Sequence, residues 1–149
     1  MPLEPPPPLL VIGNTLHHKD KSYRCAVGRS GFSANKLEGD GCTPLGIYSL
    51  RECWYRMDRL EAPKTRLPLQ IIRPEDGWCD DPNLPEYNKP IKIPFDGSHE
   101  ALFREDEIYD IIVPIGYNDA PAIADKGSAI FLHIAHEDYS PTAGCIALS

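Results

Sequence analysis

Sixteen prolines spread through 149 residues constrain the fold of this chain more than any other feature of its sequence. Proline lacks the backbone N–H that a helix interior needs, and its ring clashes with the preceding turn, so long helices are improbable. Short runs that are apolar, or that alternate between apolar and polar residues, lie between clusters of Gly, Pro, Asn and Asp. We interpret the runs 9–12, 22–27, 46–50, 70–73, 108–114 and 129–135 as strands.

One segment has the features of a short helix. Ser98 is a residue type that caps helix N-termini, Glu100 follows it, and the apolar pair Leu102 and Phe103 comes next. We therefore predict a helix over 99–105 within a mainly β fold, a twisted β-sandwich with one or two short helices. A chain of this length most simply forms one domain that buries roughly two thirds of its unfolded surface.

The charge and the N-terminus limit the partners and the location. A formal net charge of −7 argues against a nucleic-acid partner, which would require a basic patch. No stretch approaches the ~20 apolar residues of a transmembrane helix, and residues 1–8 have neither the basic nor the apolar region of a signal peptide. The prolines at 5–8 predict an extended tether, so we expect a proline-rich N-terminal segment over 1–9 and the domain over 10–149.

A histidine and a cysteine near the end of the chain could act together. His133 lies in the apolar run 129–135, where side chains alternate, so it should share a face with Phe131 and could point into a cleft. The following residues have a loop composition that can bring Cys145 back toward this strand. Free cysteine has a pKa of about 8.5 and needs a nearby base to become a nucleophile at neutral pH, and His133 could be that base.

The residues before Cys145 suit this chemistry. Gly144 has no side chain to block a carbonyl group that approaches the sulfur, and the backbone N–H groups of a turn through Ala143 and Gly144 could form an oxyanion hole. Thr142 could hydrogen-bond the loop or the acyl group, or simply support the turn.

The other cysteines and histidines give no comparable signal. The five cysteines contain no Cys-x-x-Cys pair, so a zinc ribbon or thioredoxin motif is unexpected, and their odd number leaves at least one free thiol. We interpret the four besides Cys145 as small buried side chains. His133 and His136 should face opposite sides of a strand, so they should not share a metal ion with Asp138.

His133 and the run Thr142-Ala143-Gly144-Cys145 resemble the signature of the L,D-transpeptidase catalytic domain family. The resemblance extends from about Leu10 to the end of the chain through an ordered succession of blocks. These blocks are 28–31, Lys36, 38–41, 43–44, Gly46, 76–82, 87–88, 98–100, 109–110 and 116–119.

The resemblance implies peptidoglycan chemistry and a mainly β fold. The thiolate of Cys145 would attack the carbonyl after the third residue of a stem peptide, release the terminal D-amino acid and form an acyl-enzyme. His133 would take the thiol proton and return one to the leaving amine, while the backbone carbonyl of Ile134 would orient its ring. The family uses no cofactor and no metal, acts in the periplasm or cell wall in cell-wall biogenesis and cell shape, and implies carbapenem-type β-lactams as covalent inhibitors.

Four further residues are candidates for substrate binding. Arg29 could pair with a stem-peptide carboxylate or be a solvated surface residue. Trp78, Tyr117 and Asn118 could line a groove, but core packing of Trp78 and a turn at Asn118 are equally compatible with the sequence.

Departures from the family pattern keep other functions open. This chain has Ala143 and Ala147 where many relatives have a histidine and an Arg or Asn, and Ile134 where relatives commonly have glycine. Relatives also usually continue further past the cysteine, so we expect the domain to lack a C-terminal segment. An L,D-carboxypeptidase that uses water as the acyl acceptor and a catalytically weak peptidoglycan-binding module are the alternatives.

Overall fold

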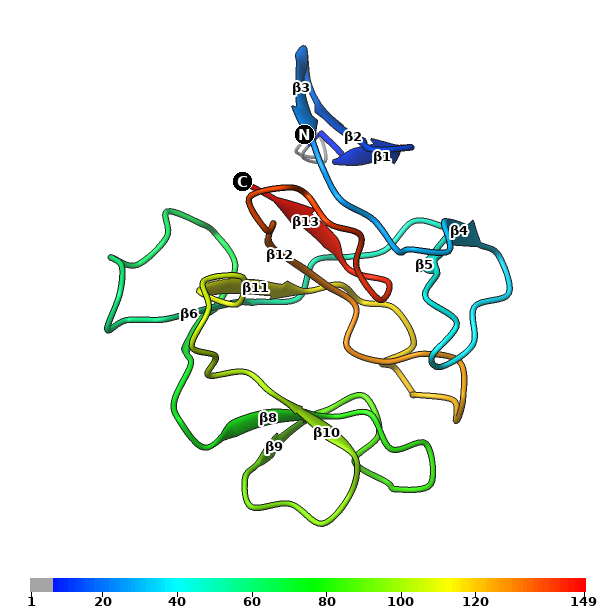
Figure 1. Cartoon of the computed structure of the whole chain (residues 1–149), viewed down its shortest axis with the longest axis vertical. Helices are drawn as coiled ribbons and strands as arrows, with labels where there is room; N and C mark the ends of the chain where they lie inside the picture. Colours follow the sequence, from blue (N-terminus) through cyan, green and yellow to red (C-terminus); the bar gives the residue numbers. More distant parts are fainter. Residues whose placement is uncertain (1–6) are drawn as a thin grey trace, which may run out of the picture.

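The computed structural model describes residues 7–149, and every regular element in this range is a β-strand (Figure 1). The mainly β fold is therefore confirmed, but the predicted helix over 99–105 is wrong. His99–Ala101 forms strand β10, which pairs antiparallel with β8 (Asp76–Cys79). The hydroxyl of Ser98 donates to Asp80 at 2.5 Å instead of capping a helix. Pairing with a neighbouring strand has overridden the local helix signal, which is only a weak preference.

The central sheet has five strands in the order β13-β12-β11-β6-β7. They are β6 (Cys53–Tyr55), β7 (Leu69–Ile71), β11 (Ile111–Pro114), β12 (Phe131–Ile134) and β13 (Ile146–Leu148). Strand β12 is antiparallel to β11 and parallel to β13. The loop between β12 and β13 must therefore return the chain to the start of β12.

Two three-stranded sheets flank the central one. The first contains β1 (Leu10–Ile12), β2 (Thr15–His18) and β3 (Lys21–Arg24), and the second contains β8, β10 and β9 (Pro90–Lys92). They lie at opposite ends of the long axis, with the central sheet between them (Figure 1). A parallel pair of short strands, β4 (Phe32–Ser33) and β5 (Thr43–Pro44), lies beside the central sheet.

The core has two parts, one on each face of β12. Phe131 is 1% exposed and packs in a cluster with Trp78, Leu102 and Tyr109. The next residue, Leu132, packs against the other cluster, which is built from Leu16, Cys25, Val27 and Ile146. The alternation predicted for this strand is thus confirmed, and both faces of the central sheet are covered.

Most of the strands predicted from the sequence are present in the structure. Five of the predicted runs overlap observed strands, but 46–50 contributes only an isolated bridge from Leu50 to Ile115. The proline-rich segment expected over 1–9 lies largely outside the described residues. The described part of the chain has no helix with the length and apolarity needed to cross a membrane.

Candidate active site

The parallel pairing of β12 with β13 determines where Cys145 lies. Leu132 is the register partner of Ile146, so Cys145, the residue before β13, lies alongside Phe131. The Phe131 N–H donates to Cys145 Sγ at 3.4 Å, and the thiol donates to the Ala129 carbonyl at 3.2 Å. Cys145 is 8% exposed. The thiol therefore rests against the backbone at the entry to β12.

His133 lies on the same strand, two residues beyond Phe131, and its ring has a defined tautomer. Nδ1 is 2.8 Å from the carbonyl oxygen of Ile134, and because a carbonyl can only accept, Nδ1 carries the proton. Nε2 is then left with its lone pair. The ring of Tyr109 packs edge-on against the imidazole, with 5.3 Å between ring centroids. His133 thus has the protonation pattern of a general base.

His133 and Cys145 line one pocket of about 310 Å³. Phe131 and Cys145 share one core cluster, and His133 alternates onto the face of Phe131, so the thiol and the imidazole are on one side of the sheet. In the described residues no hydrogen bond joins the two side chains, because the thiol donates to Ala129 and the imidazole to Ile134. Cys42 does not line this pocket, nor do the buried Cys25, Cys53 and Cys79; all five thiols are free.

Burial keeps both groups uncharged at neutral pH. Burial, and after it the Glu100 carboxylate, raises the pKa of the Cys145 thiol to about 12, although the Phe131 N–H and the Lys36 ammonium act in the opposite direction. Burial lowers the pKa of His133, and the bond to Ile134 offsets this only in part. The resting pair is therefore a neutral thiol and a neutral imidazole, not a thiolate and an imidazolium.

Glu100 and Tyr109 form a hydrogen-bonded pair in the same pocket. The Tyr109 hydroxyl donates to Glu100 Oε1 at 2.6 Å, and both residues line the pocket of Cys145. Burial raises the pKa of Glu100 and raises that of Tyr109 well above its ordinary value. These residues belong to blocks that the family resemblance includes, but nothing in their local pattern indicates that they face the cysteine.

The loop before Cys145 is held by its own hydrogen bonds. The Thr142 hydroxyl donates to the Cys145 carbonyl at 2.6 Å and accepts from the Gly144 N–H at 3.1 Å. Gly144 has a φ of +145°, and a Cβ there would lie 2.8 Å from the backbone oxygen of Cys42. Only glycine fits this position without strain. Thr142 and Ala143 line the pocket beside Cys145.

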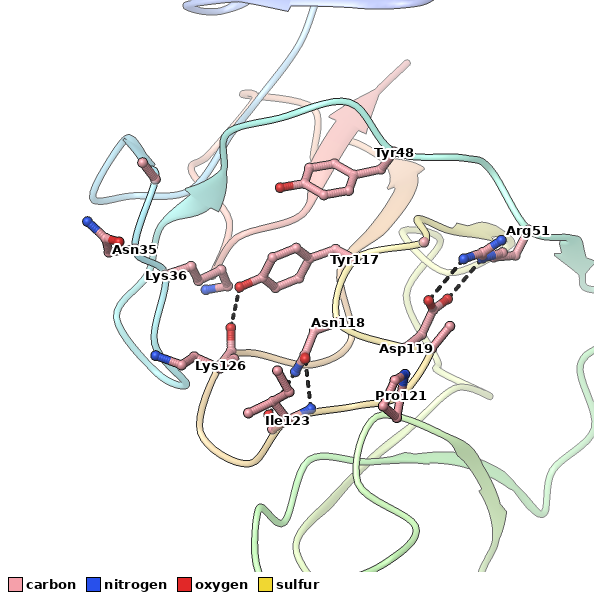
Figure 2. A pocket seen from close by; sticks show the side chains of 13 residues that line it. Asn35, Lys36, Tyr48, Arg51, Tyr117, Asn118, Asp119, Pro121, Ile123 and Lys126 are labelled. Atoms are coloured by element: carbon pink, nitrogen blue, oxygen red, sulfur yellow. Dashed lines mark hydrogen bonds and ion pairs between the residues drawn. The ribbon is translucent and has the colours of Figure 1, made fainter.

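A second, larger pocket of about 570 Å³ holds two of the predicted substrate residues (Figure 2). The Tyr117 hydroxyl donates to the Lys126 carbonyl, and its ring packs edge-on against Tyr48 with 5.4 Å between centroids. Asn118 donates from Nδ2 to the carbonyls of Ile123 and Gly127 and has a φ of +53°. These two residues thus lie apart from the cysteine pocket, and Asn118 also holds a loop.

The other two predicted substrate residues are elsewhere. Trp78 is 7% exposed in the core, where its ring packs edge-on against Phe131 and its Nε1 donates to Asn88 at 2.9 Å. Arg29 is exposed, and its backbone N–H donates to the Thr142 carbonyl at 2.8 Å. Neither residue lines the cysteine pocket.

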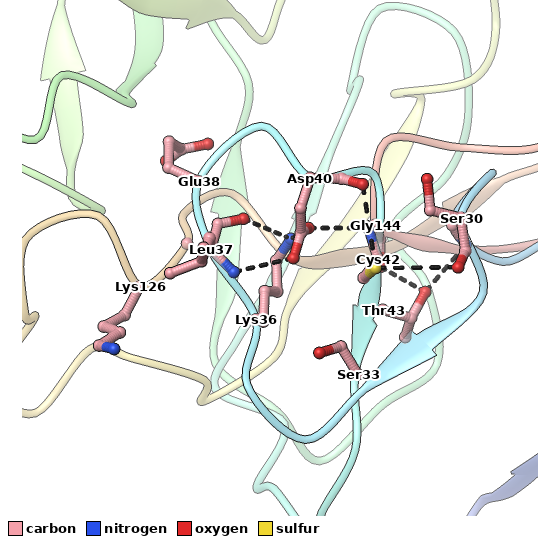
Figure 3. Close-up of polar contacts among 12 residues, drawn as sticks. Ser30, Ser33, Lys36, Leu37, Glu38, Asp40, Cys42, Thr43, Lys126 and Gly144 are labelled. Carbon is pink, nitrogen blue, oxygen red and sulfur yellow. Dashed lines mark hydrogen bonds and ion pairs between the residues drawn. The ribbon is translucent and has the colours of Figure 1, made fainter.

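Lys36 lines both pockets, although the sequence pattern does not predict it as a site residue. Its Nζ donates to Asp40 at 2.8 Å in the loop that faces Gly144 (Figure 3). In the sequence, Lys36 is part of a polar stretch typical of a solvated loop, so its burial gives no local signal. Within residues 7–149, no three His, Cys, Asp or Glu side chains are grouped so as to hold a metal ion.

A family model for the L,D-transpeptidase catalytic domain (YkuD) matches residues 11–149. The match covers nearly the whole chain, so the protein belongs to this family, whose members are cysteine-dependent, cell-wall-associated and act on peptidoglycan peptides. No curated protein and no solved structure matches the chain.

Proposed function

We propose that this protein is an L,D-transpeptidase that acts on peptidoglycan stem peptides through an acyl-enzyme on Cys145. One observation carries the proposal: the Cys145 thiol lines the same pocket as His133, whose Nδ1–H is held by the Ile134 carbonyl so that Nε2 can accept a proton. Family membership supplies the substrate class.

In the first half-reaction the Cys145 sulfur attacks the carbonyl carbon of the L,D-peptide bond as its proton passes to His133 Nε2. The resulting imidazolium returns that proton to the leaving nitrogen, the C–N bond breaks, and the D-amino acid departs, which leaves a thioester. Since both groups are neutral at rest, the proton transfer has to accompany the attack. The thiol exchanges its bond to the Ala129 carbonyl for one to His133 in this step.

The loop 142–145 is the part of the site that would stabilise the tetrahedral intermediate. Backbone N–H groups there could donate to the oxyanion, with Gly144 and Ala143 leaving room for it. The Thr142 hydroxyl, which bonds both Gly144 and the Cys145 carbonyl, would hold the loop in place.

In the second half-reaction an amine of a neighbouring stem takes the acyl group and forms a cross-link, or a free D-amino acid exchanges with the one released. Water in the same position would make the protein an L,D-carboxypeptidase. We place part of the substrate in the second pocket, against Tyr117 and Asn118, and a stem carboxylate near Arg29. Trp78 is buried in the core and packs edge-on against Phe131, so it would support the strand that carries His133. The proposal implies action in the periplasm or cell wall.

A catalytically weak binding module is the second candidate, and one observation favours it. Cys145 is 8% exposed and its thiol donates to the backbone, so its reactivity toward an acyl group is restrained in this conformation.

Incubation with a purified disaccharide-tetrapeptide, followed by mass analysis, tests the proposal. A transpeptidase gives cross-linked dimers with release of the D-amino acid, and a carboxypeptidase gives only trimmed tripeptide. Binding without any mass change would support the module. Products that appear equally with Cys145→Ala would contradict the assignment of the nucleophile.

A further inference from the structure

Lys36 is one of the few buried charged residues of the chain. Its side chain is 3% exposed, and its Nζ donates to Asp40 Oδ1 at 2.8 Å and to the Leu37 carbonyl at 3.5 Å. Lysine is rarely buried this deeply, because four methylene groups normally allow its ammonium to reach water. The fold therefore fixes the position of the Lys36 ammonium group.

Two glycines make room for the side chain. A Cβ at Gly127 would lie 2.9 Å from Lys36 Cε, and one at Gly144 would lie 3.4 Å from Lys36 Nζ. Both glycines have positive φ, +116° and +145°, so both positions disfavour other residues. The lysine chain thus passes Gly127 and ends beside the residue that precedes Cys145.

The position of the Lys36 ammonium suits a charge that assists catalysis. An ammonium has three donors, and the contacts to Asp40 and Leu37 use two of them. Asp40 in turn is held by the backbone N–H groups of Leu37 and Cys42 at 2.8 and 2.9 Å. Partial burial would raise the pKa of Asp40, but these bonds and Lys36 lower it to about 2, so the carboxylate of Asp40 stays ionised at neutral pH.

The titratable groups that line the pocket of Cys145 are Lys36, Glu38, Asp80, Glu100, Tyr109, His133 and His136. The carboxylates oppose a negative charge on the sulfur, and His133 is neutral until it receives the proton. Lys36 is the only lysine or arginine among the described residues that line this pocket.

We propose that Lys36 is a positioning residue for the nucleophile: its ammonium, held by Asp40 beside Gly144, stabilises the negative charge that develops on Cys145 Sγ as the proton leaves. This inference rests on the proposed function only for the identity of the nucleophile. Alkylation of the thiol tests it without any acyl transfer, so failure of the transpeptidase assignment would leave the test intact.

The experiment measures the rate of Cys145 alkylation by iodoacetamide between pH 7 and 10, with peptide mapping to separate the five cysteines. Lys36→Met should slow alkylation of Cys145 about tenfold, which corresponds to a rise of about one unit in the thiol pKa. Lys64→Met, which removes an exposed lysine that does not line the pocket, is the matched control and should leave the rate unchanged. Superimposable pH profiles for the two variants would overturn the proposal.

A second pair of variants covers the case in which Lys36→Met does not fold cooperatively. Lys36→Arg and Lys36→Gln both keep a donor toward Asp40, but only arginine keeps the charge. The arginine variant should follow the wild-type pH profile and the glutamine variant should be displaced to higher pH. A purely structural lysine would give two equal profiles, and this result would also overturn the proposal.

Discussion

The resting protonation state of the cysteine and histidine is the residue-scale feature with the clearest consequence. Many cysteine enzymes rely on a lowered thiol pKa, whereas burial here raises the pKa of Cys145 and lowers that of His133. The base is then available at neutral pH, and the thiol is not ionised in advance. Catalysis by this pair depends on geometry at the moment of attack more than on a stored thiolate.

This state predicts the pH dependence of activity. His133 must be neutral to accept the proton, and its pKa is lowered from 6.5, so kcat/KM should fall only as the pH drops below that value. Because the pKa of the Cys145 thiol is about 12, no loss of kcat/KM is expected as the pH rises from 7 to 9. The rate of D-amino acid release from a stem peptide measures the profile. A bell-shaped profile that declines between pH 7 and 9 would instead indicate a preformed thiolate–imidazolium pair.

Gly144 supports a second residue-scale prediction. Gly144→Ala would combine a φ of +145° with a Cβ 2.8 Å from the Cys42 carbonyl oxygen, so we expect a loss of about 2–3 kcal/mol in the free energy of unfolding. Gly31→Ala is the matched control, since Gly31 has a φ of +82° but open space around its Cβ position. It should lose only about 1 kcal/mol. Equal losses in urea denaturation would show that the contact with Cys42 has no effect.

At the scale of elements, the sequence predicts those strands whose signal is local. The run 129–135 is apolar enough to be recognised, and β12 lies within it. Strand β8 reads Asp-Gly-Trp-Cys, which resembles a loop, yet it is buried throughout. A Cβ at Gly77 would lie 2.8 Å from Ile91 and 2.9 Å from the Glu100 carbonyl, so only the absence of a side chain lets these residues approach so closely. The need for glycine at this position thus depends on residues that are distant in sequence.

The residues of the site also fall into two groups, those with a local sequence signal and those without one. Cys145 and His133 lie within one supersecondary unit, formed by β12, the following loop and β13, so the sequence alone predicts both residues as site candidates. Lys36, Glu100 and Tyr109 reach the pocket from separate parts of the chain, because the flanking sheet and the loop before β5 pack over β12. Only the tertiary fold brings these side chains to the cysteine.

Asn88 connects these elements and gives an element-scale prediction. Its Oδ1 accepts from Trp78 Nε1 at 2.9 Å and from the Ala129 N–H at 3.0 Å, and its Nδ2 donates to the carbonyls of Tyr117 and Asn118. Asn88→Ala would leave these buried groups unpaired, so we expect a loss of about 2–4 kcal/mol in unfolding free energy.

Asn83→Ala is the control for this prediction, since the Asn83 side chain is exposed and should change the unfolding free energy by less than about 0.5 kcal/mol. Chemical denaturation of both variants measures the difference. Similar small losses would show that the four contacts of Asn88 do not tie β8 to the start of β12.

At the scale of the whole molecule, the central sheet determines the architecture of the site. Its two faces pack on separate core clusters, and the pocket forms where β12 and the loop before β13 meet the sheet of β8–β10. The thiol and the imidazole are held by backbone groups of the central sheet, while Glu100 comes from β10 and Tyr109 from the segment between β10 and β11. The pocket thus depends on the packing of two sheets.

Reaction with a carbapenem tests most directly whether Cys145 is the acyl-accepting nucleophile. Attack by the thiol opens the β-lactam ring without a leaving group, so intact-mass analysis should show the protein gaining the whole mass of one carbapenem. Cys145→Ala should gain none, and Cys42→Ala, which removes a partly exposed thiol outside the pocket, should still gain it. Absence of the adduct on the wild-type protein, or its persistence on Cys145→Ala, would contradict the account.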